Sequence, residues 1–513
     1  MAVMQQQELQ IHRLPLIVTE YTRPIASSST LSTSSGIVGV GVVGLMVVGS
    51  LSAGTKDQRL INAIPDKIKN PLTGSETFYV MKRPGFGTLN TPASGERGSA
   101  VHVWSGKGSG TDVISAFGAT NSTIYNGTSS LGSTTGKVKF ISDTLVGTTA
   151  NLTFVTDSNT AYYYPNGGAL TQITDGDFPG NVGGQTITGN FAFLDGYAFI
   201  MTTTGRIYNS DLNSLSAWSA SSYISANMLP DAGVGLARYK DQIVAFGKES
   251  TEFFSDVGNP TGSPLQLTSQ GFINIGAVAS RCIKEVDDTV VWVGATSASG
   301  IGLYCLEGLQ AKKLSNPAIE SLLATTNTDE LYINVIKLVG KTLITIVSTA
   351  IATTYVYCME DEIWHEWAGN TILWQHMHGV SSNVKYIYAV SEQTTSGKVY
   401  LINPTSFSFQ DDGSNYTFTI QTSRWDLDND KRKFLRKLRL IGDKETAAAS
   451  VDISWSDDDY QTYSTARTVD MSTDFHTLNN CGAFRRRSFT ISYAGSTPLR
   501  LHGLELELVQ GTH

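Results

Sequence analysis

A short strand-like segment with an aromatic residue recurs along the middle of the chain, and this repeat constrains the fold more than any other feature. The aromatic positions are Tyr125, Tyr163, Tyr208, Phe254, Tyr304, Tyr357 and Tyr400. Their mean spacing is about 46 residues, which is the length of one four-stranded propeller blade. The repeat therefore predicts a β-propeller of about six blades.

Each repeat unit contains the same order of signals. Two apolar runs flank a tight turn, whose residues are Asp195-Gly196, Lys240-Asp241, Asp287-Asp288 and Val339-Gly340. Asp and Gly supply the unusual φ angles that a two-residue hairpin needs. A further apolar residue follows the aromatic position in four units, at Ile173, Trp218, Leu314 and Trp367. This order predicts four strands in each unit.

The chain as a whole is predicted to be all-β. The best helix candidate begins at Pro317 and is short. After about residue 412 the aromatic repeat stops, and new alternating segments suit a C-terminal β-sandwich. We expect an extended N-terminal segment at 1–98, with a Ser/Thr-rich and Gly/Val-rich insertion at 25–54. The propeller is expected at 99–412 and the sandwich at 413–513.

The composition and motifs argue against several classes of function. The formal net charge is −8, whereas affinity for nucleic acid comes mainly from Lys and Arg. No P-loop, nucleophile elbow, zincin or dinucleotide motif is present, so neither an enzyme nor a cofactor is predicted. His376 and His378 lack a nearby third ligand, so no metal site is predicted. The cysteines show no metal spacing and are expected to be buried structural thiols: Cys282, Cys305, Cys358 and Cys481.

The densest charge feature is a basic stretch near residue 435. It consists of Lys431, Arg432, Lys433, Arg436, Lys437 and Arg439. Alternation puts Phe434, Leu438 and Leu440 on one face of a strand and leaves the other face basic. Three interpretations are open: an edge or solvated strand protected by its charge, a surface that docks onto an acidic neighbour, and a contact with DNA. The triplet Arg485, Arg486 and Arg487 has the same three readings. Both are candidate protein interfaces.

Residues 456–463, SDDDYQTY, resemble a degenerate Asp-box, a hairpin motif of sialidase propellers. The segment occurs once and lacks the Gly of that motif. We therefore predict an acidic hairpin turn.

An apolar run at 36–49, GIVGVGVVGLMVVG, is shorter than the ~18 residues that span a bilayer, so a membrane partner is not expected. A lone Gly-rich hairpin is unstable in water, so something must cover it. The candidate residues are Ile37, Val38, Val40, Val42, Val43, Leu45, Met46, Val47 and Val48.

Several short motifs occur in an order that resembles one family. They are LPL (14–16), NAIPDKIKNP (62–71), KRPGFGTL (82–89), DQIVAFGKESTEFFSDVGNP (241–260), QGFINIGAVASRC (270–282), AIESLL (318–323) and LRLHGLELEL (499–508). This order is similar to that of the packaged-DNA stabilisation protein of short-tailed phages, also described as a tail hub or tail nozzle. The resemblance covers most of 55–510 and excludes the insertion at 25–54.

In the light of this resemblance, three readings are open for the apolar run at 36–49. It could be a hairpin packed on a neighbouring subunit or tail protein, a loop near the channel axis, or a segment that inserts into a membrane after genome ejection.

The resemblance implies a structural virion protein that is assembled in the host cytoplasm. It implies a homo-hexameric ring below the portal and adaptor rings, a tail needle or plug at the far end, and spikes or fibres outside. Double-stranded DNA would pass through without specific binding, and the ring would retain the genome and guide its ejection. The alternative function is a carbohydrate-recognising propeller, in which exposed aromatic residues would line sugar sites in several blades.

Overall fold

The computed structural model describes residues 9–16, 58–69, 76–104, 112–259, 261–296, 300–348, 354–369, 377–382, 386–392, 394–427 and 429–511. The chain divides into two compact units. Pro84–Tyr416 form one unit, the propeller, and Met1–Arg83 with Thr417–His513 form the other, the terminal unit. The sequence places the boundaries at 98/99 and 412/413, whereas the compact units divide at 83/84 and 416/417.

The first four blades are consecutive four-stranded antiparallel sheets. Blade one contains β6 (Gly98–Trp104), β7 (Asp112–Phe117), β8 (Thr123–Asn126) and β9 (Ser129–Ser133). Blade two contains β10 (Val138–Val146), β11 (Thr149–Thr156), β12 (Ala161–Pro165) and β13 (Thr171–Gln172). Blade three contains β14 (Ile187–Leu194), β15 (Tyr197–Thr202), β16 (Arg206–Ser210) and β17 (Trp218–Ser225). Blade four contains β18 (Gly233–Tyr239), β19 (Gln242–Gly247), β20 (Thr251–Asp256) and β21 (Leu265–Ile273).

Three further blades complete the ring. In blade five, β22 (Gly276–Ala277), the 3-10 turn η2 (Ser280–Cys282) and β23 (Ile283–Val286) precede β24 (Thr289–Thr296), β25 (Gly300–Glu307) and β26 (Gln310–Lys313). Blade six follows α1 (Pro317–Thr325) and η3 (Thr328–Glu330), and contains β27 (Leu331–Leu338), β28 (Lys341–Ser348), β29 (Thr354–Cys358) and β30 (Ile363–Trp367). Blade seven contains β31 (Met377–Ser382), β32 (Ile387–Ser391), β33 (Val399–Ile402) and β5 (Gly87–Asn90), and the hairpin β34 (Gln410–Asp411) and β35 (Ser414–Asn415) follows it.

The all-β propeller is confirmed, but the expected number of about six blades is wrong. Across the described ranges of the propeller there are seven blades, one for each aromatic position. The expected number was taken from the six intervals between the seven aromatic positions, and this is one fewer than the number of repeat units. The last blade is also hard to recognise, because its fourth strand, β5, precedes the first blade in sequence and pairs with β33.

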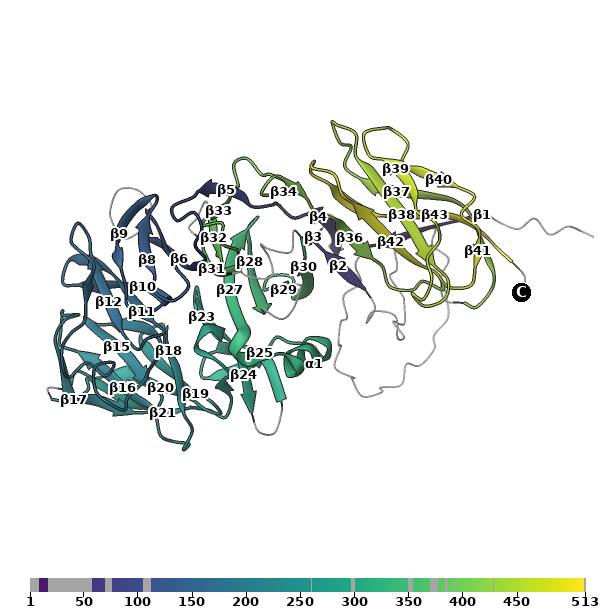
Figure 1. The fold of residues 1–513 in the computed structure, drawn as a ribbon. Coiled ribbons are helices and arrows are strands. Elements are labelled where there is room, and N and C mark those ends of the chain that lie inside the picture. The colour runs from purple at the N-terminus through teal and green to yellow at the C-terminus, as the bar shows by residue number, and fades with distance from the viewer. Residues whose placement is uncertain are drawn as a thin grey trace, which may run out of the picture. The chain divides into compact units, whose positions relative to one another are not determined.

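The ring is closed by contacts between the first strands of neighbouring blades. These inner strands contact one another in the order β6, β10, β14, β18, β23, β27 and β31. The last of them, β31, contacts β6, and the two lie side by side in Figure 1. The predicted two-residue turns connect first and second strands, as in Leu194↔Tyr197 and Tyr239↔Gln242. The first residue of each turn has the positive φ that such hairpins require: Asp195, Lys240, Asp287 and Val339. These turn predictions are confirmed.

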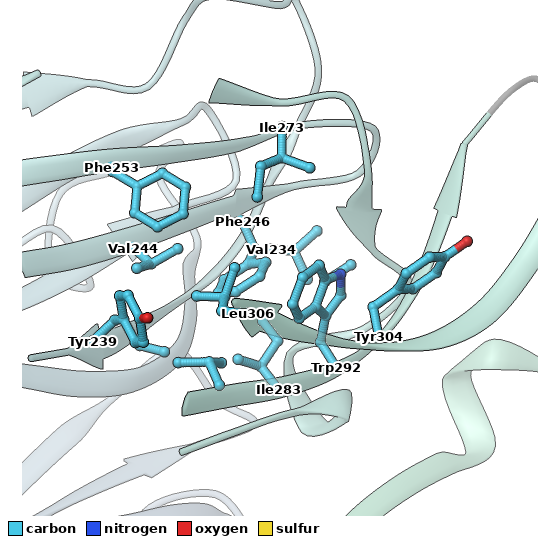
Figure 2. Close-up of a cluster of buried hydrophobic side chains, with 13 residues drawn as sticks. Val234, Tyr239, Val244, Phe246, Phe253, Ile273, Ile283, Trp292, Tyr304 and Leu306 are labelled. Carbon is cyan, nitrogen blue, oxygen red and sulfur yellow. The ribbon is translucent and has the colours of Figure 1, made fainter. Parts of the chain in front are cut away.

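The hydrophobic core lies between the blades rather than in one central mass. Figure 2 shows the cluster between blades four and five, in which Phe246 and Phe253 face Trp292 and Leu306. The Trp292 ring lies 5.3 Å from Phe246 and 5.8 Å from Tyr304, centroid to centroid. Similar clusters join five further pairs of neighbouring blades, including blades seven and one. Blades one to five are thus buried on both faces by their neighbours.

The helix and the cysteine predictions are also confirmed. Helix α1 starts with Pro317 in its first turn, and the side chain of Asn316 accepts a hydrogen bond from the backbone of Ile319 at 3.0 Å. The four cysteines are free and buried. Burial raises the pKa of the Cys282 thiol to about 12, so this thiol stays protonated at neutral pH.

The terminal unit contains two sheets built from both ends of the chain. One has the order β3 (Ala63–Lys69), β4 (Glu76–Lys82), β43 (Arg500–Gln510), β37 (Lys433–Gly442) and β40 (Thr477–Asn479), with β1 (Leu9–Pro15) on β43 and β41 (Ala483–Phe484) on β37. The other has the order β2 (Arg59–Ile61), β36 (Phe418–Gln421), β42 (Ser488–Tyr493), β38 (Ser450–Ser456) and β39 (Arg467–Asp470). The face-to-face sandwich stays a prediction.

We expect Trp292→Ala to destabilise the propeller by about 3–5 kcal/mol, because it leaves a cavity between two blades. Leu309→Ala, at an exposed position in the same blade, should change the free energy of unfolding little. Urea unfolding of both variants measures the difference. Equal effects of the two substitutions would contradict the assignment of the core to the space between blades.

Candidate protein-interaction face

The basic stretch forms β37, which lies inside its sheet. It pairs with β43 on one side and with β40 and β41 on the other, so it is not an edge strand. The register shifts between Leu435 and Lys437, which indicates a β-bulge at Arg436. The predicted apolar face is therefore confirmed for Leu438 and Leu440, which are buried, and wrong for Phe434, which is 44% exposed while Leu435 is buried in its place. The extra residue breaks the simple two-residue alternation.

The outward side of β37 carries cations that are interleaved with carboxylates. Arg432, Arg436 and Arg439 are exposed, and the guanidinium of Arg432 lies 6.0 Å from the ring of Phe434. Across the ladder, Lys437 lies opposite Glu507 and Arg439 opposite Glu505. We call this surface, from Arg432 to Arg439, the basic face.

The sequence pattern around Glu505 and Glu507 could have revealed their role in the basic face. In the run LELEL, the alternation puts both carboxylates on the side opposite the buried leucines. Glu505, which lies opposite Arg439, also contacts a cation from strand β1, because the Nε of Arg13 donates to Oε2 of Glu505 at 3.1 Å. The pairing of Arg13 with residues almost 500 positions later has no local signal.

Lys433 is separate from the basic face, although it belongs to the same stretch. Its side chain is buried, and its ammonium donates to three backbone carbonyls, those of Asn429, Lys431 and Arg485. Burial lowers the pKa of Lys433, and Arg485 lowers it further, while Asp426 and Asp430 oppose the shift. Lys433 thus holds the start of β37 to the loop before it and to the arginine triplet.

The arginine triplet meets acidic partners within the same unit. Arg487 is 2% exposed, and its Nε and Nη2 donate to the two carboxylate oxygens of Asp457 at 2.6 and 2.7 Å. Its third donor group reaches the carbonyl of Cys481 at 2.6 Å. Arg486 donates to Asp459 at 2.9 Å. The acidic hairpin therefore neutralises two members of the triplet, and Arg487 is a structural residue.

The acidic hairpin has the hydrogen-bond pattern of a tight polar turn. Asp458 accepts from the side chain of Ser456 at 2.8 Å and from the backbone of Thr462 at 2.9 Å, and it also bonds the Thr462 hydroxyl. Tyr460, which stands where an Asp-box has Gly, has φ +68°. The Thr462 hydroxyl, the Thr462 backbone and Ser456 lower the pKa of Asp458 to about 2. The predicted acidic hairpin turn is confirmed.

Other candidate residues fall outside the structural description. The run at 36–49, from Ile37 to Val48, and His376 lie outside the described residues, and the side chain of His378 is not described. Where side chains are described, no group of three or more His, Cys, Asp or Glu is placed to hold a metal ion. No helix in the described ranges has the length and hydropathy of a membrane span.

Asp457→Ala should destabilise the terminal unit by about 2–3 kcal/mol, because it leaves the buried Arg487 guanidinium without its carboxylate. The cost stays below that of a fully buried pair since Asp457 is 41% exposed. Asp459→Ala is the matched control in the same hairpin. Its arginine partners are partly exposed, so the loss should be about 0–1 kcal/mol. Chemical denaturation would measure both, and equal losses would contradict the structural role of Arg487.

The low pKa of Asp458 predicts a pH-dependent contribution to stability. The carboxylate stabilises the fold fully above its ordinary pKa of about 4, and this contribution is lost as the pH falls toward about 2. The difference in unfolding free energy between the native protein and Asp458→Asn should therefore shrink between pH 4 and pH 2. A difference that stays constant from pH 7 to pH 2 would contradict this.

Comparisons with solved structures give weak similarities. The chain is 10% identical to BamB of Moraxella catarrhalis, with 62% of this chain and 99% of that chain covered and a TM-score of 0.34. It is 8% identical to the β-propeller domain of Cps50 (Swd1) of Myceliophteria thermophila, with 62% and 98% covered and a TM-score of 0.40. The chain is 8% identical to the N-terminal domain of Nup159, with 66% of this chain and 97% of that chain covered and a TM-score of 0.38. No curated protein matches the sequence.

A sequence family matches more than half of the chain. The family is described as the phage stabilisation family, bacteriophage P22 Gp10, β-propeller, and it matches residues 74–343. This range includes blades one to five and, in blade six, β27 and the start of β28. The described fold of this range is a propeller, which agrees with the description of the family. The chain therefore belongs to the phage stabilisation family of the P22 Gp10 β-propeller, and it has a structural role in the phage particle.

Proposed function

We propose that this chain is the hub, or nozzle, of a short phage tail, where it completes the DNA channel, retains the packaged genome and guides its ejection. The single observation that carries the proposal is the family match over residues 74–343. The proposed assembly is a homo-hexameric ring. Adaptor and portal rings would lie above it, a needle or plug below it, and spikes or fibres outside it.

The division of charge between the two units supports a conduit that does not bind DNA tightly. The propeller unit contains 16 Lys and Arg against 27 Asp and Glu, which gives a formal charge of −11. The terminal unit contains 21 Lys and Arg against 18 Asp and Glu, which gives +3. Tight phosphate contacts would stall ejection, and an acidic wall repels the phosphate backbone. We assign the basic face to protein neighbours.

The aromatic repeat gives no support to the carbohydrate-binding alternative. A sugar site needs an exposed aromatic ring, whereas five of the seven repeated aromatics are buried: Tyr208, Phe254, Tyr304, Tyr357 and Tyr400. The first four of these pack in the clusters between blades and serve the fold.

Phage particles assembled without this chain should package DNA and then lose it, because the end of the channel is left open. The measurement is the fraction of packaged DNA that becomes accessible to nuclease, together with electron microscopy of the particles. Particles that carry the native chain are the control. Particles that lack the chain but retain protected DNA and infect normally would contradict the proposed function.

A further inference from the structure

One end of the propeller carries a concentration of exposed carboxylates. Every blade repeats the same strand order around the ring, so the turns between first and second strands share an end with the turns between third and fourth strands. We call this end, in blades three to six, the acidic turn end. Asp287 and Asp288 form one such turn, and Glu360 and Glu362 lie in another.

The charge balance of the acidic turn end is strongly negative. Eleven Asp and Glu lie within two residues of these turns in the described chain: Asp195, Asp211, Asp241, Asp256, Glu285, Asp287, Asp288, Glu307, Glu360, Asp361 and Glu362. Four cations lie within the same distance: Arg238, Lys240, Lys337 and Lys341. Two of them are already paired, Lys337 with Asp287 and Lys341 with Asp361, and Lys312, one position beyond this distance, pairs with Glu307 and Glu362. All the carboxylates except Asp256 and Asp361 belong to exposed residues.

The basic face of the terminal unit has the opposite sign. Arg432, Arg436 and Arg439 are exposed and Lys437 is half-buried, while Glu505 and Glu507 supply the only two carboxylates on the paired positions of β43. The exposed ring of Phe434 lies among these cations. Arginine and aromatic side chains are enriched at the centres of protein interfaces.

We propose that the basic face of one copy of this chain binds the acidic turn end of an adjacent copy. The proposal rests on the homo-hexameric ring of the proposed function, and it names the two surfaces that join neighbouring copies of the chain in that ring. Each copy carries one surface of each sign on two different units. Such a pair of unlike surfaces is what a heterologous, head-to-tail contact requires, and heterologous contacts that close form rings.

The interleaved carboxylates favour a protein partner over DNA. A phosphate backbone lying along β37 would approach Glu505 and Glu507 as closely as it approaches Arg439 and Lys437. Separate carboxylates on turns can instead meet individual arginines. The acidic turn end offers such carboxylates on four consecutive blades. Complementary charge of this kind fixes register and partner choice.

Charge reversal in the full-length chain tests the contact. Arg436→Glu with Arg439→Glu makes the basic face acidic, and Asp288→Lys with Glu307→Lys makes the acidic turn end less acidic. Each double variant alone should self-associate at least about tenfold more weakly than the native chain, as judged by sedimentation velocity and native mass spectrometry. An equimolar mixture should restore assembly, because the two variants then alternate. Association of the native chain should weaken from about 50 mM to about 500 mM NaCl.

The matched control places the same charge change elsewhere. Glu96→Lys with Glu249→Lys alters two exposed glutamates at the opposite end of the blades and should leave assembly unchanged. Circular dichroism and unfolding curves show whether every variant is folded. Native rings that are indifferent to the reversals, or folded variants whose mixture does not reassemble, would overturn the contact but not the proposed function. A native chain that stays monomeric would overturn both the contact and the hexamer, while loss of DNA from particles without the chain would remain a separate result.

Discussion

Apolar packing between neighbouring blades is the interaction on which the rest of the propeller depends. A four-stranded sheet with two apolar faces cannot exist alone in water, and here apolar clusters join six pairs of neighbouring blades. The ring must therefore close before its first and last blades are buried. Closure is completed by the contact of β31 with β6 and by the pairing of β5 with β33. The turns and loops are positioned by this packing, including the carboxylates at the acidic turn end.

Buried and exposed cations of the terminal unit are neutralised in different ways. The buried cations Lys433 and Arg487 are surrounded by carbonyls, a carboxylate and aromatic rings, as expected for charges removed from water. The exposed cations of the basic face are balanced only in part by Glu505 and Glu507. A single basic stretch therefore contains two kinds of residue. The buried cation stabilises the fold, and the exposed cations remain available to a partner.

Local signals predicted much of the propeller, and distant pairings escaped prediction. The turns at Asp195 and Asp287 were predictable because Asp tolerates a positive φ, and α1 was predictable from Pro317. The bulge at Arg436 was not predictable, because nothing in the sequence announces the extra residue that turns Phe434 outward. The partners of Arg487 and Arg13 lie 30 and 492 positions away, so the composition of each stretch could not identify them. The division at 83/84 depends on similar distant pairing, as between β1 and β43.

The pairing of β5 with β33 also determines when the propeller can close during synthesis of the chain. Thr88 lies ahead of every other blade strand in the chain, yet its partner in the seventh blade, Tyr400, is made some 310 residues later. At the ordinary speed of a ribosome this interval is about 15–60 s, during which β5 has no neighbour with which to pair. The first blade likewise waits for the last, because β6 is covered by β31. The unit thus becomes a ring only near the end of its synthesis, and a nascent chain halted in blade five or six would present open strand edges to chaperones and to other nascent chains.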